Sequence, residues 1–184
     1  MKVAVTGHVE WVEFARVDYV PAPGEIVQVE ETWEEPAGGG AVAAVQLARL
    51  SGAAVLYTVL GDDEQGRRSV ERLSELGVEV RASIREQPTR RAVTLVDGAG
   101  ERTITTFGPR LNPSPADAAH DWQALAEMDG VYFTAGDVAA LLAARAARML
   151  VASPRARDAL GHGVAVLLIE PLERGDGHCL HHRG

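Results

Sequence analysis

Residues 38–66 read GGGAVAAVQLARLSGAAVLYTVLGDDEQG, and this stretch decides the fold class. Three glycines lead into a helix expected over about 41–50, and an apolar strand follows over 54–60. Because only Gln46 and Arg49 are polar within this helix, we expect it to be covered nearly all round. The carboxylates after Gly61 sit where they would cap the N-terminus of a second helix. A strand between two helices is typical of βαβ units.

The same alternation of strands and helices continues on both sides of this stretch. Such a pattern predicts an α/β fold around a largely parallel sheet. The expected elements are a strand over 3–6, a helix over 64–76 that Gly77 ends as a left-handed cap, a strand over 78–84, a helix from Ser114 through Met128, a strand over 131–134, a helix capped by Asp137 that reaches about Arg148, and a strand over 149–152.

Two segments depart from the alternation and predict a small β excursion. In the hairpin, strands over 92–96 and 102–107 are joined by Asp97-Gly98-Ala99-Gly100-Glu101. In the other, a turn over 21–24 separates two extended stretches, one with Phe14, Val17 and Tyr19 and one with Ile26, Val27 and Val29.

Composition excludes several classes of function. The 184-residue chain has a formal net charge of −8, and no cluster of Lys and Arg suggests a nucleic-acid surface. A single cysteine, Cys179, excludes an intramolecular disulfide and suits a reducing cytoplasm. The N-terminus lacks the pattern of a signal peptide, and no apolar run approaches the roughly 20 residues of a membrane span. We therefore expect a cytoplasmic protein without nucleic-acid or membrane partners.

The sequence changes character after about Gly163. Residues 164–169 resemble one more strand, but the remainder of 164–184 has no apolar periodicity, and a disordered tail is the favoured interpretation. A metal-binding tail is the alternative, since His178, Cys179, His181 and His182 are metal-ligand types at close spacing. His8, which follows the first strand, either lines a site or is packed in the core.

In their order and spacing, these motifs resemble the ribokinase-like, or PfkB, family of carbohydrate kinases. The resemblance covers roughly residues 1–160 and rests on Gly7-His8-Val9-Glu10, Pro21-Ala22-Pro23-Gly24-Glu25, Gly38-Gly39-Gly40, Gly52, and Gly61-Asp62-Asp63-Glu64-Gln65-Gly66. It implies a three-layer αβα sandwich, incomplete in this chain, over residues 1–163. It also implies a small β lid over the sugar, formed by about 13–34 and 90–108.

The resemblance also implies which residues bind the substrate. Glu10 falls where many members have an asparagine that bonds sugar hydroxyls, and Val12 falls where many have an aspartate. Gly38 and Gly39 match the glycine pair that lets the sugar approach the backbone. Gly40 replaces a frequent lysine, and Ala43 replaces the asparagine of the family signature. These departures predict a divergent subgroup with an altered or less polar sugar pocket.

The function implied is transfer of the γ-phosphoryl group of ATP, with Mg²⁺, to a hydroxyl group of a sugar or nucleoside. The family continues with an Asn-x-x-Glu-like motif and a Gly-Ala-Gly-Asp turn that supplies the anion hole and the base, and neither is present in this sequence. We therefore expect a truncated, nearly inactive kinase chain, and the alternative is a non-catalytic sugar-binding or interaction protein. Members of the family that pair their lids suggest a homodimer through the lid.

Overall fold

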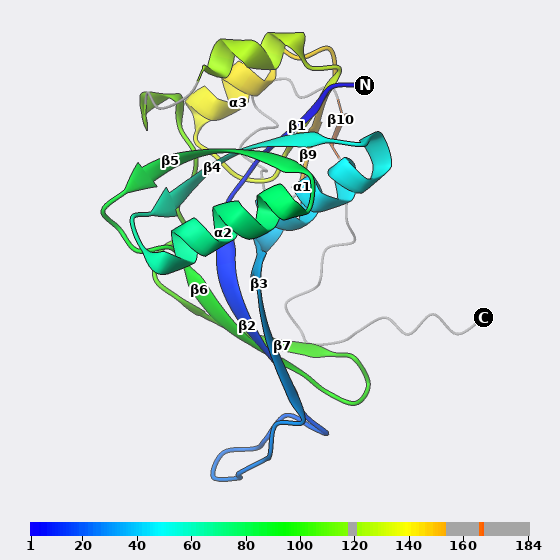
Figure 1. Cartoon of the computed structure of the whole chain (residues 1–184), viewed down its shortest axis with the longest axis vertical. Coiled ribbons are helices and arrows are strands. Elements are labelled where there is room, and N and C mark those ends of the chain that lie inside the picture. The colour runs from blue at the N-terminus through cyan, green and yellow to red at the C-terminus, as the bar shows by residue number, and fades with distance from the viewer. Residues whose placement is uncertain (118–120, 154–165, 168–184) are drawn as a thin grey trace, which may run out of the picture.

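The computed structural model describes residues 1–117, 121–153 and 166–167. Its centre is a six-stranded parallel sheet in the order β10-β9-β8-β1-β4-β5. Helices α1 and α2 lie on one face, and α3 lies on the other (Figure 1). A second, four-stranded sheet in the order β3-β2-β6-β7 projects from this α/β part, and we call it the lid. The α/β fold expected from the sequence is confirmed.

The elements follow one another along the chain as strands, helices and short 3-10 helices. They are β1 (Val3–Thr6), β2 (Glu10–Arg16), β3 (Glu31–Ala37), α1 (Gly38–Ser51), β4 (Ala54–Gly61), α2 (Glu64–Glu75), β5 (Val78–Arg85), β6 (Arg91–Val96), β7 (Arg102–Phe107), η1 (Pro115–Asp117), η2 (Trp122–Glu127), β8 (Gly130–Phe133), α3 (Val138–Ala144), β9 (Leu150–Ala152) and β10 (Val166–Leu167).

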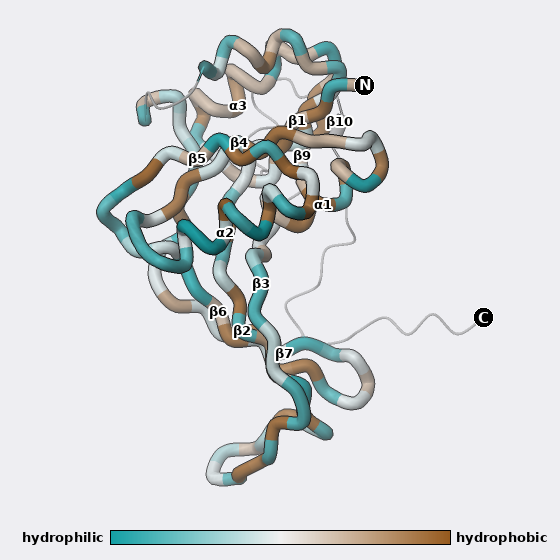
Figure 2. The backbone as a smooth tube through the Cα atoms, viewed as in Figure 1, coloured by the Kyte–Doolittle hydropathy of each residue, from teal (hydrophilic) through white to brown (hydrophobic). Residues whose placement is uncertain are grey.

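Helices cover both faces of the central sheet, and successive side chains of each strand point to opposite faces. Val3 and Val5 of β1 pack in a core beneath α1 and α2, whereas Ala4 packs in a second core beneath η2 and α3. Figure 2 shows β1 as hydrophobic along its length and α2 as largely hydrophilic. These two cores give the three layers of the fold.

The lid begins directly after the first strand of the central sheet. β2 pairs antiparallel with β3 and parallel with β6, and β6 pairs antiparallel with β7. Phe14 and Trp33 are cross-strand partners on β2 and β3, and their rings stack with centroids 5.0 Å apart. The expected hairpin of β6 and β7 is confirmed.

The structure corrects the other part of the β excursion. The partner of β2 is Glu31–Ala37 rather than the stretch around Ile26, Val27 and Val29, and Ile26 is 96% exposed. The reason is that β3 lies at the edge of the lid and pairs with one strand only, so it does not need the apolar side chains of a buried strand.

Helix α1 differs from its expected burial. Ala41, Ala44 and Ala48 are buried against the sheet, but Val42 and Leu50 are 52% and 82% exposed. Small alanines bring one face of the helix close to the sheet, and the opposite face remains uncovered in the described part of the protein. The expectation of a helix covered nearly all round is therefore wrong.

The single helix expected from Ser114 through Met128 is also wrong. The structure has two short 3-10 helices there, η1 and η2, with residues 118–120 outside the described ranges. Ser114 accepts a hydrogen bond from the Ala116 amide, and Asp121 starts η2 by accepting one from Gln123. Each of these side chains begins its own short turn, which explains why no continuous helix forms.

The predicted helix ends are confirmed at three positions. Asp63 caps α2 by accepting from the Gly66 amide, and Asp137 caps α3 by accepting from the Ala140 amide. Gly77 has a φ of 83° after the last turn of α2. α3 ends at Ala144, one turn earlier than expected.

Little of the expected tail lies within the described ranges. Of the strand expected over 164–169, the structure describes β10 alone, and the cysteine and histidine cluster lies outside the described residues. None of the helices in the described part of the chain has the length and apolar composition that a membrane span requires.

Candidate functional site

A cavity of about 590 Å³ lies between the lid and the α/β part. Its walls combine backbone glycines, hydroxyl groups, small apolar side chains and several charged groups, which suits a small polar ligand. The lining residues are His8, Glu10, Val12, Phe14, Ala37, Gly38, Gly39, Val42, Ala43, Arg90, Ala92, Thr94, Arg102, Ile104, Thr106, Arg110, Tyr132, Thr134 and Ser153.

The floor of the cavity is formed where parallel strands of the central sheet end. His8 follows β1, Thr134 follows β8, and Ser153 follows β9. Carboxyl ends of parallel strands meet at one edge of a sheet, and ligands of open α/β folds bind at that edge. The topology alone therefore brings these three polar residues together.

The N-terminus of α1 forms a second wall of the cavity. Gly38 has a φ of 85°, and a Cβ added to it would lie 3.1 Å from the His8 carbonyl oxygen, so a glycine is required there. The helix has no side-chain cap and no acidic residue in its first turn, and the Gly40 amide donates to the His8 carbonyl oxygen at 3.0 Å. The positive end of the 14-residue helix thus lies at the cavity beside Gly38 and Gly39.

The roof of the cavity is one face of the lid. Alternate residues of its strands line the cavity, as the two-residue period of a β-strand requires. They are Glu10, Val12 and Phe14 of β2, Ala92 and Thr94 of β6, and Arg102, Ile104 and Thr106 of β7.

Glu10 is the centre of a buried charged cluster at the join between the lid and the floor. Its Oε1 lies 3.3 Å from Nε2 of His8 and 3.2 Å from Nε of Arg90, with side chains that are 11%, 6% and 14% exposed. The hydrogen bond with His8 lowers the pKa of Glu10 more than burial raises it. The charges of Arg90 and Arg110 also lower this pKa. Glu10 is therefore an ionised acceptor, and its low pKa makes it a poor general base.

Two atoms of this cluster retain hydrogen-bonding capacity. Nδ1 of His8 is buried and has no hydrogen-bond partner within the described residues. Nε of Arg90 is close to Glu10, but the two groups do not have hydrogen-bond geometry, so their attraction is Coulombic. Buried donors without partners are costly unless a ligand or water satisfies them, which is typical of a binding site.

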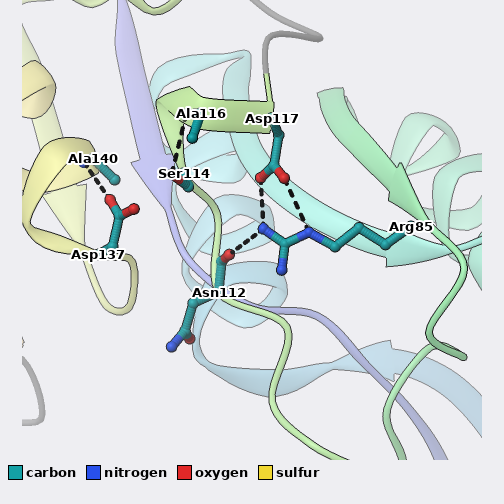
Figure 3. A network of polar contacts seen from close by, with 7 residues as sticks. All are labelled: Arg85, Asn112, Ser114, Ala116, Asp117, Asp137 and Ala140. Carbon is teal, nitrogen blue, oxygen red and sulfur yellow. Dashed lines mark hydrogen bonds and ion pairs between the residues drawn. The ribbon is translucent and has the colours of Figure 1, made fainter.

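A network of polar contacts anchors the chain just after Arg110, at Asn112 and Pro113 (Figure 3). The Arg85 guanidinium donates to both carboxylate oxygens of Asp117, at 3.0 and 2.7 Å, and to the Asn112 carbonyl oxygen at 3.3 Å. The Asp137 amide donates to the Pro113 carbonyl oxygen. A bidentate arginine–carboxylate pair has a defined geometry. It therefore fixes the position of the segment that follows the lid strand β7 relative to β5.

Of the six residues implied by the family resemblance, the structure brings Glu10, Val12, Gly38, Gly39 and Ala43 to the cavity. Gly40 is not among the lining residues. It is buried behind them, where an added Cβ would lie 2.7 Å from both the Gly7 carbonyl carbon and the His8 carbonyl oxygen. Gly40 therefore has a packing role in the structure.

Sequence reasoning missed the arginines and threonines of the lid and left His8 open. The sequence did contain a signal. Ala92 and Thr94 alternate along β6, just after Arg90, and Arg102, Ile104 and Thr106 alternate along its hairpin partner β7. What the sequence did not show was which of the two faces meets the α/β part. Within the described residues, no group of three or more His, Cys, Asp or Glu gathers at a possible metal site.

Comparisons with known proteins agree with this architecture. The model of the pfkB family of carbohydrate kinases matches residues 1–173. A comparison with curated protein sequences gives no significant match.

Three solved structures illustrate the similarity. A ribokinase from Thermotoga maritima has 25% identity and a TM-score of 0.68, covering 89% of this chain and 55% of the other. A ribokinase from Arabidopsis thaliana complexed with ribose and ATP has 20% identity and a TM-score of 0.63, with 83% and 53% covered. Phosphofructokinase-2 from Escherichia coli in complex with fructose-6-phosphate has 17% identity and a TM-score of 0.69, with 90% and 60% covered. This chain thus spans less than two thirds of the length of each.

Proposed function

Because the chain belongs to the pfkB family of carbohydrate kinases, we propose that its cavity binds the sugar or nucleoside whose hydroxyl group receives the γ-phosphoryl group of ATP. The observation that carries the proposal is the cavity itself, which lies at the carboxyl ends of three parallel strands and beneath the lid. The Arabidopsis thaliana ribokinase and the Escherichia coli phosphofructokinase-2 noted above hold a sugar and a sugar phosphate, respectively.

The lining residues have distinct roles in this proposal. Gly38 and Gly39 let the ligand approach the start of α1 without obstruction by a Cβ. The ionised carboxylate of Glu10 accepts hydrogen bonds from sugar hydroxyls, while Val12 and Ala43 contact apolar ring faces. Gly40 supports the site from behind.

Phosphoryl transfer in this family implies ATP and Mg²⁺. Within the described residues no three His, Cys, Asp or Glu side chains gather at a possible metal site, and no step is assigned through the metal. The proposal for this chain therefore concerns sugar binding and the position of the accepting hydroxyl. The cytoplasmic location stays a prediction from the sequence.

Isothermal titration calorimetry of the full chain with a panel of sugars and nucleosides, and separately with Mg-ATP, tests the proposal. We expect heat from at least one sugar or nucleoside, and loss of that heat in Ala43→Phe, which fills the cavity. Leu50→Phe is the matched control, since Leu50 is 82% exposed on the same helix and does not line the cavity. Binding of no sugar and no nucleoside would contradict the proposal. Heat with Mg-ATP separates a kinase from a non-catalytic sugar-binding protein.

A second proposal concerns the exposed edges of the lid. β3 and β7 are its outermost strands, and every residue of β7 is exposed, including Ile104 and Phe107, each 53% exposed. Exposed strand edges pair readily with other edges. We propose a homodimer through the lid, for which sedimentation equilibrium is the measurement. A single monomeric species across the concentration range would be evidence against it.

A further inference from the structure

The charge of the cavity is opposite to that of the chain as a whole. The formal net charge of the protein is −8, yet the cavity is lined by three arginines and by one carboxylate, that of Glu10. Charges of one sign that line a cleft concentrate ligands of the other sign. The cavity therefore favours a ligand with negative charge.

Glu10 neutralises at most one of these arginines. Arg90 is the arginine that it engages, at 3.2 Å, with both side chains largely buried. Arg102 and Arg110 are exposed at the cavity, and no ion pair is present for either in the described part of the chain. Two positive charges thus remain available to a ligand.

The backbone that follows Arg110 is anchored. The chain two residues farther on is bound through the Asn112 carbonyl oxygen to Arg85, which is itself bound to Asp117 (Figure 3). Arg110 lines the same cavity as Glu10, and its charge contributes to the lowered pKa of Glu10. A cation on a fixed segment loses less conformational freedom when it binds.

Two further features of the cavity are complementary to an anion. The N-terminus of α1 reaches the cavity without an acidic residue or a side-chain cap. His8, which is 5% exposed, has a buried Nδ1 without a hydrogen-bond partner in the described structure. The hydroxyls of Thr94 and Thr106 on the lid and of Thr134 on the floor suit the neutral part of a sugar.

We propose that the preferred ligand of this cavity is a sugar that bears an anionic group, a phosphate or a carboxylate, bound by Arg110 together with Arg102. This inference rests on the proposed function, since it specifies the class of sugar that the same cavity binds. The alternative is that Arg102 and Arg110 are solvated surface residues that bind no ligand. It does not explain why they line the cavity from two separate positions of the lid and its return segment.

Matched pairs of ligands test the proposal by calorimetry on the full chain. The pairs are fructose with fructose 6-phosphate, ribose with ribose 5-phosphate, and glucose with gluconate. We expect the anionic member of at least one pair to bind at least about tenfold more tightly than the neutral member, with a preference that weakens as salt is added. The phosphate and carboxylate arms identify which anion is recognised. A titration with inorganic phosphate measures the affinity of the protein for the anion without a sugar.

Variants then assign the preference to residues. In Arg110→Ala and in the Arg102→Ala/Arg110→Ala double variant, affinity for the anionic ligand should fall by at least about tenfold while affinity for the neutral ligand changes little. Arg91→Ala removes the same charge from β6, but Arg91 is on the strand face opposite to Ala92 and Thr94 and does not line the cavity. It should leave the preference intact. Thermal melting checks that each variant is folded.

The outcomes separate this inference from the proposed function. If neutral sugars bind as tightly as their anionic partners, or more tightly, the inference is wrong and the proposed function stands. If Arg91→Ala reduces the preference as much as Arg110→Ala does, general charge rather than this cavity is responsible, and the inference is again wrong. If no sugar of either kind binds, both are contradicted.

Discussion

Gly39 and Gly40 are adjacent in the sequence but have different surroundings at the start of α1. A Cβ at Gly40 would lie 2.7 Å from two backbone atoms of the Gly7–His8 segment, which side-chain motion cannot relieve. A Cβ at Gly39 would lie 3.4 Å from Thr134 and point toward the cavity residues. One glycine therefore sets how closely the helix approaches β1, and the other keeps the cavity open.

This difference predicts that one alanine substitution lowers the stability of the protein and that the other weakens ligand binding. Gly40→Ala should destabilise the protein by about 1–3 kcal/mol, because the helix must move away from the Gly7–His8 backbone. Gly39→Ala should change stability by less than about 0.5 kcal/mol but weaken binding of the sugar. Urea unfolding and calorimetry of both variants make the comparison. Equal losses of stability would contradict the assignment of Gly40 to packing and Gly39 to the cavity.

At the scale of elements, α2 anchors the outer face of the lid. The Arg68 guanidinium lies 4.3 Å from the centroid of the Trp11 ring on β2, and it pairs with Glu34 on β3 at 2.9 Å. Trp11 is 5% exposed, whereas Val12 beside it faces the cavity. The two faces of β2 are thus used differently, one for attachment to α2 and one for the ligand.

Arg68→Ala should loosen this attachment without unfolding the α/β part. The side chains of Arg68 and Glu34 are 42% and 41% exposed, so the ion pair contributes little, and the stacking on Trp11 adds about 0.5–1 kcal/mol. We expect faster hydrogen exchange at amides of β2 and β3 and a small change in global stability. The control is Arg72→Ala, whose arginine pairs with Glu75 within α2 alone. Unchanged exchange in the lid of Arg68→Ala would show that α2 does not anchor it.

At the scale of the whole molecule, Asp63 joins three parts of the chain. Its carboxylate caps α2 through the Gly66 amide at 2.8 Å, and it accepts from both the amide and the hydroxyl of Thr89 at 2.7 Å. The Thr89 hydroxyl also accepts from the Gly61 amide at the end of β4. Since Thr89 lies two residues before the lid strand β6, this carboxylate ties the lid to the central sheet.

The acid stability of the protein should therefore depend on Asp63. Burial raises the pKa of Asp63, but the hydrogen bonds from Thr89 and Gly66 together lower it by more. The pKa therefore lies below the ordinary value of 3.8. A lowered pKa means that the native state binds fewer protons than the unfolded state. Its stabilisation is present above pH 3.8 and is lost as the pH falls through the folded value.

Asp63→Asn should cost about 1–3 kcal/mol at pH 7, because an amide group cannot accept from all three donors. The difference from the unmodified protein should shrink as the pH is lowered below 3.8. Urea unfolding at several pH values measures it. Asp62→Asn provides the control, since that side chain is 78% exposed and pairs only with an exposed Arg67. A difference that stays constant with pH would exclude this role for the Asp63 carboxylate.

Local signals in the sequence predicted much of the fold. Asp63, Asp137 and Gly77 mark helix ends because capping depends on the few residues around each end. The expectations failed where a segment depends on distant partners. The stretch around Ile26 has the composition of a strand, but β2 pairs with Glu31–Ala37, and the helix expected after Ser114 is replaced by two short turns.

The sequence by itself determined the alternation of strands and helices, the glycine-rich start of α1 and the hairpin of β6 and β7. These features follow from hydrophobic period and backbone conformation, which neighbouring residues control. Only the tertiary structure decided that Gly40 packs against Gly7, that Arg68 meets Trp11, and that Arg90, Arg102 and Arg110 line one cavity with Glu10. The physical reason is that the face a strand turns to the cavity, and the charge gathered there, depend on how segments far apart in the chain are placed.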